Sequence, residues 1–149
     1  MKNLMKIPTP EYVPRWQPIK LSSTWIAGFS AGEMSFIITI QNNTYKLGKR
    51  ARVLVSLPQH ERDLPILVAI QNHMGCGYIV KDSGNRRVWI FRCDNPEELE
   101  NKILPFFDRF NLVTSNFLDF QDMWRFLYRY GLYRILRVLY RIIFGINRI

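Results

Sequence analysis

A chain of 149 residues, 48% of them hydrophobic, is long enough to bury one core, so the sequence predicts one folded domain. The formal net charge of +9 at pH 7 indicates a polyanionic partner, because lysine and arginine gain free energy by displacing phosphate counterions. The two cysteines, Cys76 and Cys93, have neither the spacing of a zinc-binding pair nor a histidine pair beside them. This pattern argues against a zinc site and favours ordinary buried thiols.

The N-terminal segment, residues 1–21, is predicted to be an extended basic arm, because the prolines spaced through it prevent a long helix. It lacks the apolar run of a signal peptide, and its composition is poor for a transit peptide. The prolines are Pro8, Pro10, Pro14 and Pro18.

A helix and a hairpin are predicted next. Ser22-Ser23-Thr24 supplies cap candidates for a helix that ends near Glu33. Residues 35–43 alternate in the manner of a strand, and residues 52–57 form a second strand. The side chains expected together on one face of the first strand are Phe36, Ile38 and Ile40.

A second unit of the same order follows. Asp63 can cap a helix that runs to Met74 and ends at Gly75, a residue type that favours helix termination. Residues 77–81 and 87–93 are then predicted to form a hairpin.

Two further helical regions complete the predicted order, one beginning at Pro96 and one covering residues 117–143. Residues 124–149 carry six arginines and no acid. A nucleic-acid backbone, an anionic membrane surface and a larger assembly are all possible partners for such a helix, and the phosphate interpretation is preferred. Four of the arginines fall within a sector of about 60° on a helix that advances about 100° per residue: Arg134, Arg137, Arg141 and Arg148.

The run Ile26-Ala27-Gly28-Phe29-Ser30-Ala31-Gly32-Glu33-Met34, with this order of elements, resembles the LAGLIDADG homing endonuclease family. The resemblance covers about residues 22–123 and implies an α+β, αββαββα fold with a four-stranded antiparallel saddle-like sheet. The N-terminal arm, residues 1–21, and a basic helical extension, residues 124–149, lie outside it. Further landmarks occur in the family's order: Pro58-Gln59-His60-Glu61, Met74-Gly75-Cys76-Gly77-Tyr78, Leu104-Pro105-Phe106-Phe107 and Phe117-Leu118-Asp119-Phe120.

Gly28 and Gly32 lie one helical turn apart, so two such helices can approach closely; the alternative is that this face packs on its own sheet. The resemblance implies a homodimer in which two motif helices lie side by side. Each would deliver Glu33 as a Mg²⁺-binding acid, with Gln59 as a second candidate catalytic residue. Such an ion stabilises the attacking and leaving oxygens of phosphodiester cleavage. Without that role, Glu33 is a solvated helix-end residue.

The resemblance also implies that alternate side chains of the strands contact nucleic acid. A slip of one residue inverts the set that a strand presents. Several candidates are apolar, whereas a face that reads duplex base edges should be richer in Arg, Lys, Asn and Gln. The candidates are Ile37, Thr39, Gln41, Arg50, Arg52, Tyr78, Val80, Arg87 and Trp89.

Two departures from the family's pattern bear on catalysis. Met34 replaces a glycine, where a side chain is expected to crowd the metal and a positive φ becomes costly. Basic residues that the family tends to carry near the active site are replaced by His60-Glu61-Arg62-Asp63 and Thr114-Ser115-Asn116. A positive charge that stabilises the transition state is therefore expected to be missing.

These departures favour a nuclease-impaired protein that binds RNA structurally beside neighbouring proteins in an organellar ribonucleoprotein such as the mitochondrial ribosome, without a cofactor. One alternative is an active intron-encoded homing endonuclease that cleaves double-stranded DNA as a Mg²⁺-dependent homodimer. A second alternative is an intron maturase. The resemblance implies an organelle, the mitochondrion first, because such genes are often carried in organellar introns.

Overall fold

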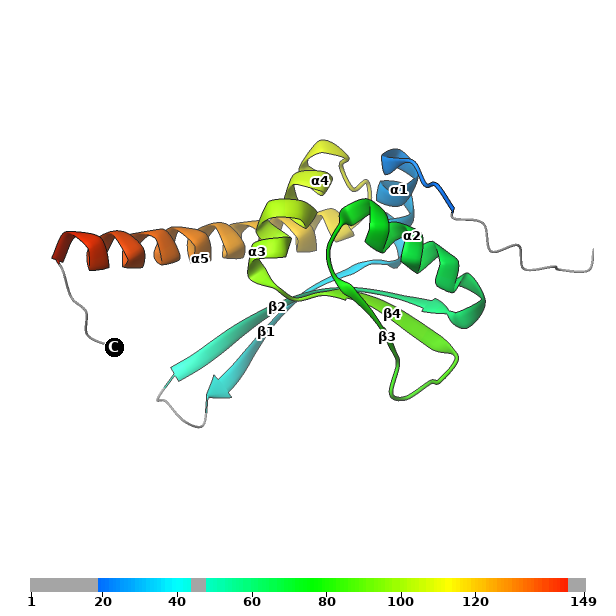
Figure 1. Cartoon of the computed structure of the whole chain (residues 1–149), viewed down its shortest axis with the longest axis horizontal. Helices are drawn as coiled ribbons and strands as arrows, with labels where there is room; N and C mark the ends of the chain where they lie inside the picture. Colours follow the sequence, from blue (N-terminus) through cyan, green and yellow to red (C-terminus); the bar gives the residue numbers. More distant parts are fainter. Residues whose placement is uncertain (1–18, 44–47, 145–149) are drawn as a thin grey trace, which may run out of the picture.

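A computed structural model describes residues 19–43 and 48–144, and the predicted N-terminal arm therefore lies outside the described residues apart from its last three positions. The order of elements confirms the predicted αββαββα fold (Figure 1). The elements are α1 (Ser23–Glu33), β1 (Ser35–Asn43), β2 (Gly48–His60), the 3₁₀ helix η1 (Glu61–Asp63), α2 (Leu64–Met74), β3 (Tyr78–Lys81), β4 (Val88–Cys93), α3 (Pro96–Glu98), the π-helix η2 (Leu99–Ile103), α4 (Leu104–Arg109) and α5 (Asn116–Phe144).

The sheet is antiparallel, has the order β1-β2-β4-β3, and carries the helices on one face only (Figure 1). Phe36, Val55 and Cys93 form one row across three strands, and all three side chains are buried beneath the helices. Because side chains alternate along a strand, this row fixes which residues face the helices and which face outward.

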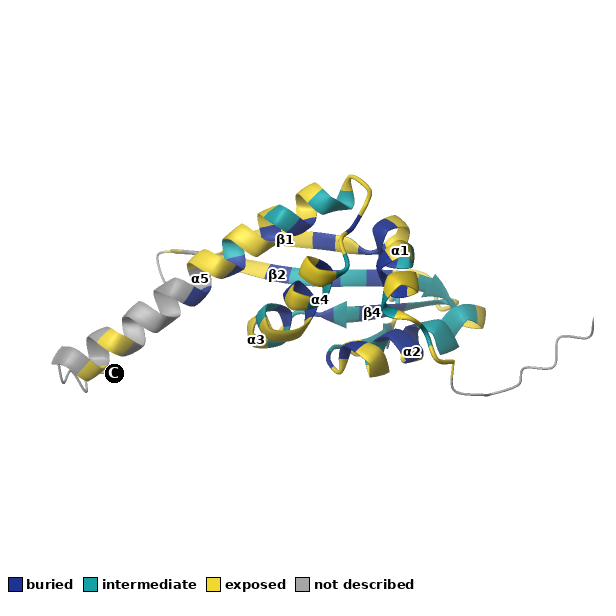
Figure 2. Ribbon diagram, turned by 90° about the horizontal axis from the view of Figure 1, so that it is seen from above, coloured by how far each residue is buried: buried dark blue, intermediate teal, exposed yellow. Residues whose placement is uncertain are grey.

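The core lies between the helices and the sheet (Figure 2). Phe36 meets the rings of Phe107 and Phe120 edge-on, each with centroids 5.6 Å apart, so β1, α4 and α5 share one aromatic cluster. Edge-to-face geometry stabilises such pairs by about 1 kcal/mol beyond burial. Ile38 and Ile40, expected on the same face as Phe36, are exposed because the far part of the β1–β2 hairpin diverges from the helices above it (Figure 1).

Local capping explains where the first helices begin and end. Ser22 Oγ accepts a hydrogen bond from the backbone N–H of Trp25 at 3.2 Å, which confirms a cap at the start of α1. Gly75 has φ of 66° and ends α2 in the left-handed conformation, as predicted. Asp63 occupies the N-cap position of α2, as predicted, but its side chain makes no capping hydrogen bond. The chain first makes η1, where the His60 ring accepts the N–H of Arg62 at 3.2 Å.

The lengths of β2 and α5 bear on where the sequence placed the strand ends and the domain boundary. β2 is longer than residues 52–57, because its first half pairs with β1 and its second half continues as the partner of β4. α5 closely matches the predicted 117–143 helix and runs unbroken through residue 124, so the proposed domain boundary there is not the end of an element. Among the described residues, no helix is long and apolar enough to cross a membrane.

Candidate active site and nucleic-acid interface

Glu33 is the last residue of α1 and its carboxylate is exposed to solvent. Gln59, near the end of β2, donates a hydrogen bond from Nε2 to Glu33 Oε2 at 3.4 Å. The structure thus brings together the two candidate catalytic residues, which are 26 positions apart in the sequence. Gln59 reaches Glu33 because its strand position lies on the helix-covered side of the sheet, below the end of α1.

Met34 neither crowds this carboxylate nor strains the backbone, so the expected obstacle at this position was wrong. Its φ is −85° and its ψ is 141°, an ordinary extended conformation that leads straight into β1. Its side chain is 1% exposed and belongs to the hydrophobic core, away from the solvent that surrounds Glu33. Because β1 begins at the next residue, position 34 needs an extended backbone, which methionine adopts as readily as glycine.

The loop before α5 holds the end of α1 in place. Thr114 Oγ1 donates to the carbonyl oxygen of Ala31 at 2.6 Å. Asn116 Nδ2 donates to the same oxygen at 2.9 Å and to the carbonyl oxygen of Met34 at 2.7 Å. The last carbonyls of a helix lack partners within the helix, so these donors stabilise the turn that carries Glu33. Sequence reasoning missed this role, although Thr and Asn are residue types that commonly bond backbone groups.

Two arginines close in sequence to the replaced basic positions, Arg62 and Arg109, lie in ordinary surface settings. Arg62 is highly exposed, and its Nε lies 3.7 Å from the carboxylate of its neighbour Asp63. Arg109 lies against the Phe110 ring, with the guanidinium carbon 5.6 Å from the ring centroid. Neither contact joins these arginines to Glu33.

The glycine face of α1 is open. A Cβ atom added to Gly28 or Gly32 would meet nothing within 4 Å in the described structure. The alternative in which this face packs on its own sheet is therefore wrong. On the same helix, Trp25 is 42% exposed and stacks on Phe29 with ring centroids 4.9 Å apart. An uncovered small-residue surface beside a large aromatic side chain is suited to contact with another helix.

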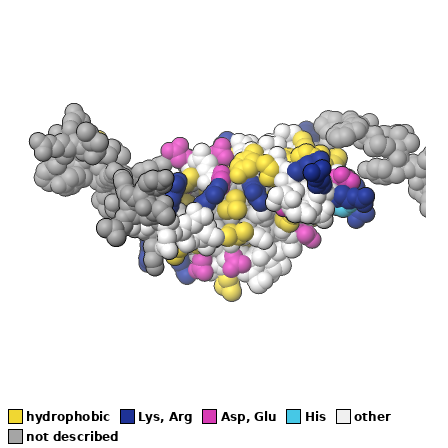
Figure 3. Space-filling view, turned by 90° about the horizontal axis from the view of Figure 1, so that it is seen from below, with side chains coloured by type: hydrophobic (Ala, Val, Ile, Leu, Met, Phe, Trp, Pro, Cys, Tyr) yellow, Lys and Arg dark blue, Asp and Glu magenta, His cyan; other side chains and the backbone are white. Residues whose placement is uncertain are grey.

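The uncovered face of the sheet carries most of the candidate nucleic-acid contacts. Thr39 pairs with Arg52, and Gln41 pairs with Arg50, so these four side chains share that face, and all four residues are exposed. In Figure 3, which views the molecule from below, hydrophobic side chains gather near the middle with lysine or arginine side chains beside them. Ile37, Tyr78 and Val80 occupy the same face by register.

Two candidates were assigned to the wrong place. Trp89 pairs with Gln59 and Lys81 on the helix-covered side, where its ring packs against the core and lies 5.2 Å from the Lys81 ammonium. Arg87 lies in the turn before β4 rather than on the strand. The predicted set slipped by one residue in β4, and the outward positions there are those of Val88, Ile90 and Arg92.

A polar cluster on the uncovered face was also missed. Arg52 Nη2 donates to Asp94 Oδ2 at 2.8 Å, and the Tyr78 hydroxyl donates to the same oxygen at 3.2 Å. The hydrogen bond and charge of Asp94 raise the pKa of Arg52, while burial and then Asp94 raise the pKa of Tyr78. Arg92 lies between Tyr78 and Ser56, and its buried Nε atom has no hydrogen-bond partner in the described structure. These residues make the middle of the face polar as well as apolar.

The four C-terminal arginines that are predicted to share one helix face cannot be placed in this interface. The side chains of Arg134, Arg137 and Arg141, and all of Arg148, lie outside the described residues. Their contact with nucleic acid stays a prediction.

The model of the LAGLIDADG endonuclease family matches residues 26–127. The probable intron-encoded endonuclease 2 of Neurospora crassa is 35% identical over 101 residues, which cover 66% of this chain and 22% of that protein. The probable intron-encoded endonuclease Cox1-I1b of Schizosaccharomyces pombe is 35% identical over 105 residues, covering 69% of this chain and 26% of that protein. The chain therefore spans about a quarter of the length of these relatives.

The fold is shared with solved homing endonucleases. The structure of I-SmaMI bound to an uncleaved DNA target in the presence of calcium ions matches with a TM-score of 0.76 and 26% identity. That match covers 85% of this chain and 43% of the I-SmaMI chain. The family model spans the motif helix, the complete sheet and the start of α5, which are the elements that position Glu33. By this match the chain belongs to the LAGLIDADG endonuclease family.

Proposed function

We propose that this chain binds duplex DNA on the uncovered face of its sheet and cleaves phosphodiester bonds beside Glu33. The observation that carries the proposal is the placement of an exposed carboxylate at the end of α1, hydrogen-bonded to Gln59 and free of the expected obstruction by Met34. I-SmaMI, which has the same fold and is bound to a DNA target, supports the choice of DNA.

A pair of motif helices completes the proposed site. One chain offers one Glu33, and each strand of a duplex presents its own scissile phosphate. The open Gly28 and Gly32 face allows a second motif helix to approach α1 with its backbone close, which brings two such carboxylates near one another. We propose a homodimer formed through this face, with an intron-encoded origin and a mitochondrial location like those the resemblance implies.

Mg²⁺ fits the donors at this position. Glu33 offers exposed carboxylate oxygen, and Mg²⁺ is usually bound by one or two carboxylates together with water and phosphate oxygens. When bound, such an ion supplies charge that stabilises the attacking and leaving oxygens. Gln59 orients Glu33 through its amide N–H, and Thr114 and Asn116 fix the helix end from which Glu33 projects.

The expectation of a structural RNA-binding subunit loses one of its principal reasons. Met34 was one of the two departures that were expected to impair catalysis, and its side chain lies in the core with an unstrained backbone. The relatives reported above are named endonucleases, and none is named as a ribosomal protein. The endonuclease alternative therefore replaces the ribosomal reading as the proposal.

The test is cleavage of a pooled library of random duplex inserts by the full chain in Mg²⁺, with sequencing of the ends that are produced. We expect double-strand breaks at one family of related sites. Glu33→Gln should abolish the breaks while duplex binding, measured by gel shift on a selected site, stays within about twofold. Asp108→Asn, which changes an exposed acid on α4, is the matched control and should cut normally.

Two results would overturn the proposal. One is cleavage that Glu33→Gln leaves unchanged, which removes Glu33 from the chemistry. The other is tight binding to RNA with neither binding nor cutting of any duplex in the library, which restores the ribonucleoprotein interpretation.

A further inference from the structure

Cys76 and Cys93, which are 17 positions apart in the sequence, meet in the folded chain. Cys76 lies between Gly75 and Gly77, two glycines with positive φ that turn the chain from α2 into β3. Cys93 is the last residue of β4 and its side chain is fully buried. The expectation of buried thiols was correct, but their sequence spacing concealed their proximity.

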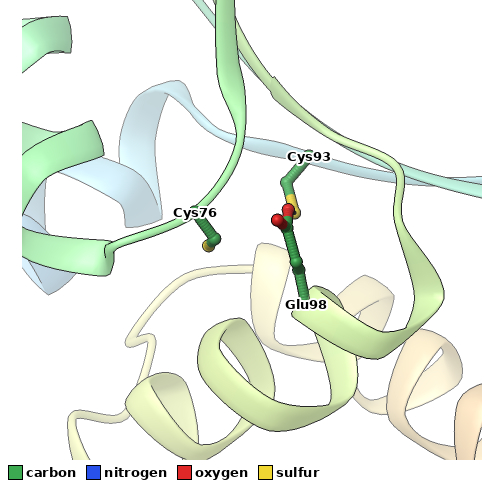
Figure 4. A group of neighbouring side chains, drawn as sticks. All are labelled: Cys76, Cys93 and Glu98. Atoms are coloured by element: carbon green, nitrogen blue, oxygen red, sulfur yellow. The ribbon is translucent and has the colours of Figure 1, made fainter.

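A carboxylate from a third element reaches the same point. Glu98, at the end of α3, accepts the backbone N–H of Gly77 at 3.2 Å and the Cys93 thiol at 3.7 Å through Oε2. The ligand atoms of Cys76, Cys93 and Glu98 all lie within 4.8 Å of one another. Figure 4 shows these side chains approaching from the turn after α2, from β4 and from α3.

We infer that Cys76, Cys93 and Glu98 form a binding site for a thiophilic divalent cation, Zn²⁺ in the first place, with water in the fourth position. Sulfur and oxygen ligands on a tetrahedral zinc ion lie about 3.5 Å apart, given Zn–S of about 2.3 Å and Zn–O of about 2.0 Å. The observed 3.7 Å between Cys93 Sγ and Glu98 Oε2 is close to that separation. Binding an ion requires the longest distance in the group, which is at most 4.8 Å, to shorten to such a separation.

The charges around the two cysteines also favour the binding of a cation. The two buried cysteines lie beside the partly buried carboxylate of Glu98, whose negative charge attracts a cation to this point. A divalent ion replaces the two thiol protons, which leave to solvent. Two thiolates and one carboxylate with a dication leave one negative charge, which the neighbouring Lys102 ammonium, hydrogen-bonded to the Gly75 carbonyl, offsets.

A disulfide between the two cysteines is the competing outcome, and Glu98 argues against it. A disulfide needs no carboxylate, whereas Glu98 supplies a third metal-ligating atom at the point where the two cysteines meet. Soft thiolate ligands also select zinc over Mg²⁺, so the site is chemically distinct from the one at Glu33.

A bound ion would stabilise the sheet next to the polar cluster on the uncovered face, which Arg52, Asp94 and Tyr78 form. Cys93 adjoins Asp94, and Cys76 is two residues before Tyr78, whose hydroxyl bonds to Asp94. An ion held by three elements would fix the β3–β4 half of the sheet from its covered side. This inference does not depend on the proposed nuclease activity.

The test is titration of the reduced, chelator-treated full chain with Co²⁺ and then Zn²⁺. Because the chain has only two cysteines, a sulfur-to-cobalt charge-transfer band can come only from Cys76 and Cys93. We expect this band to saturate at one ion per chain, to disappear on addition of Zn²⁺, and to be accompanied by a rise in Tm. Glu98→Gln should weaken affinity by about tenfold or more, while Glu61→Gln, an exposed acid, should not.

Cys76→Ser should reduce the band, with circular dichroism as the check that the variant folds. If that variant does not fold, the wild-type band and the Glu98→Gln affinity still decide the matter. Absence of the band and of bound zinc in folded wild type would overturn the inference. So would recovery of the two cysteines as a disulfide that does not bind metal after reduction.

Discussion

Replacing Asn116 with alanine should loosen the end of α1. The substitution removes two hydrogen bonds, at 2.9 Å to the Ala31 carbonyl and at 2.7 Å to the Met34 carbonyl, both partly buried. Each such bond contributes about 1 kcal/mol net, so the free energy of unfolding should fall by about 2 kcal/mol. For a chain of 149 residues this corresponds to a fall in Tm of about 4 to 8 °C.

Urea denaturation followed by circular dichroism measures this change. Asn111→Ala, at an exposed position in the same loop, is the matched control and should change stability by less than about 0.5 kcal/mol. Thr114→Val removes the other donor to the Ala31 carbonyl, and the double variant should deviate from additivity because the two donors share one acceptor. A loss below about 0.5 kcal/mol for Asn116→Ala would refute the assigned role.

Three further substitutions test other parts of the structure. Gly28→Leu should change the free energy of unfolding of the monomer by no more than about 1 kcal/mol, because the site is open. The same variant should shift the protein from dimer to monomer in sedimentation velocity, and an unchanged dimer would exclude this face as the dimer interface. Gly77→Ala should cost more than about 2 kcal/mol in urea denaturation, since its Cβ would lie 2.6 Å from Phe91 at a φ of +79°, whereas Gly84→Ala should be tolerated. Ser30→Ala should raise the free energy of unfolding by about 1 kcal/mol, because the buried Ser30 hydroxyl has no partner in the described structure. The expected result is a higher urea midpoint with an unchanged slope, whereas a lower midpoint would show that the hydroxyl makes a stabilising hydrogen bond.

The order of the elements could be read from the sequence because its signals are local. The cap at Ser22, the left-handed Gly75 and the alternation in β1 each depend on a few neighbouring residues. The face of β4 could not be read in this way. Its residues, Val88-Trp89-Ile90-Phe91-Arg92-Cys93, are nearly all apolar, so they carry no alternation that separates the two sides.

Contacts between distant segments were the other limit. The Thr114 and Asn116 bonds to α1 join residues more than 80 positions apart, and no pattern in either segment marks the pairing. Met34 was misread for a different reason. The expectation assumed a glycine-like backbone at that position, whereas the start of β1 requires only an extended one.

Asp94 holds two side chains of the uncovered sheet face in place before any partner binds. A long arginine side chain and a tyrosine hydroxyl are both anchored to one carboxylate oxygen before any partner arrives. The hydrogen bond to Asp94 restricts the rotation of Arg52, so this side chain has less rotational freedom to lose when a complex forms. The same carboxylate repels phosphate, so an incoming backbone must either displace Asp94 from Arg52 or pass to one side of the pair. Selectivity at this point on the surface would then arise from competition between two anions for one guanidinium.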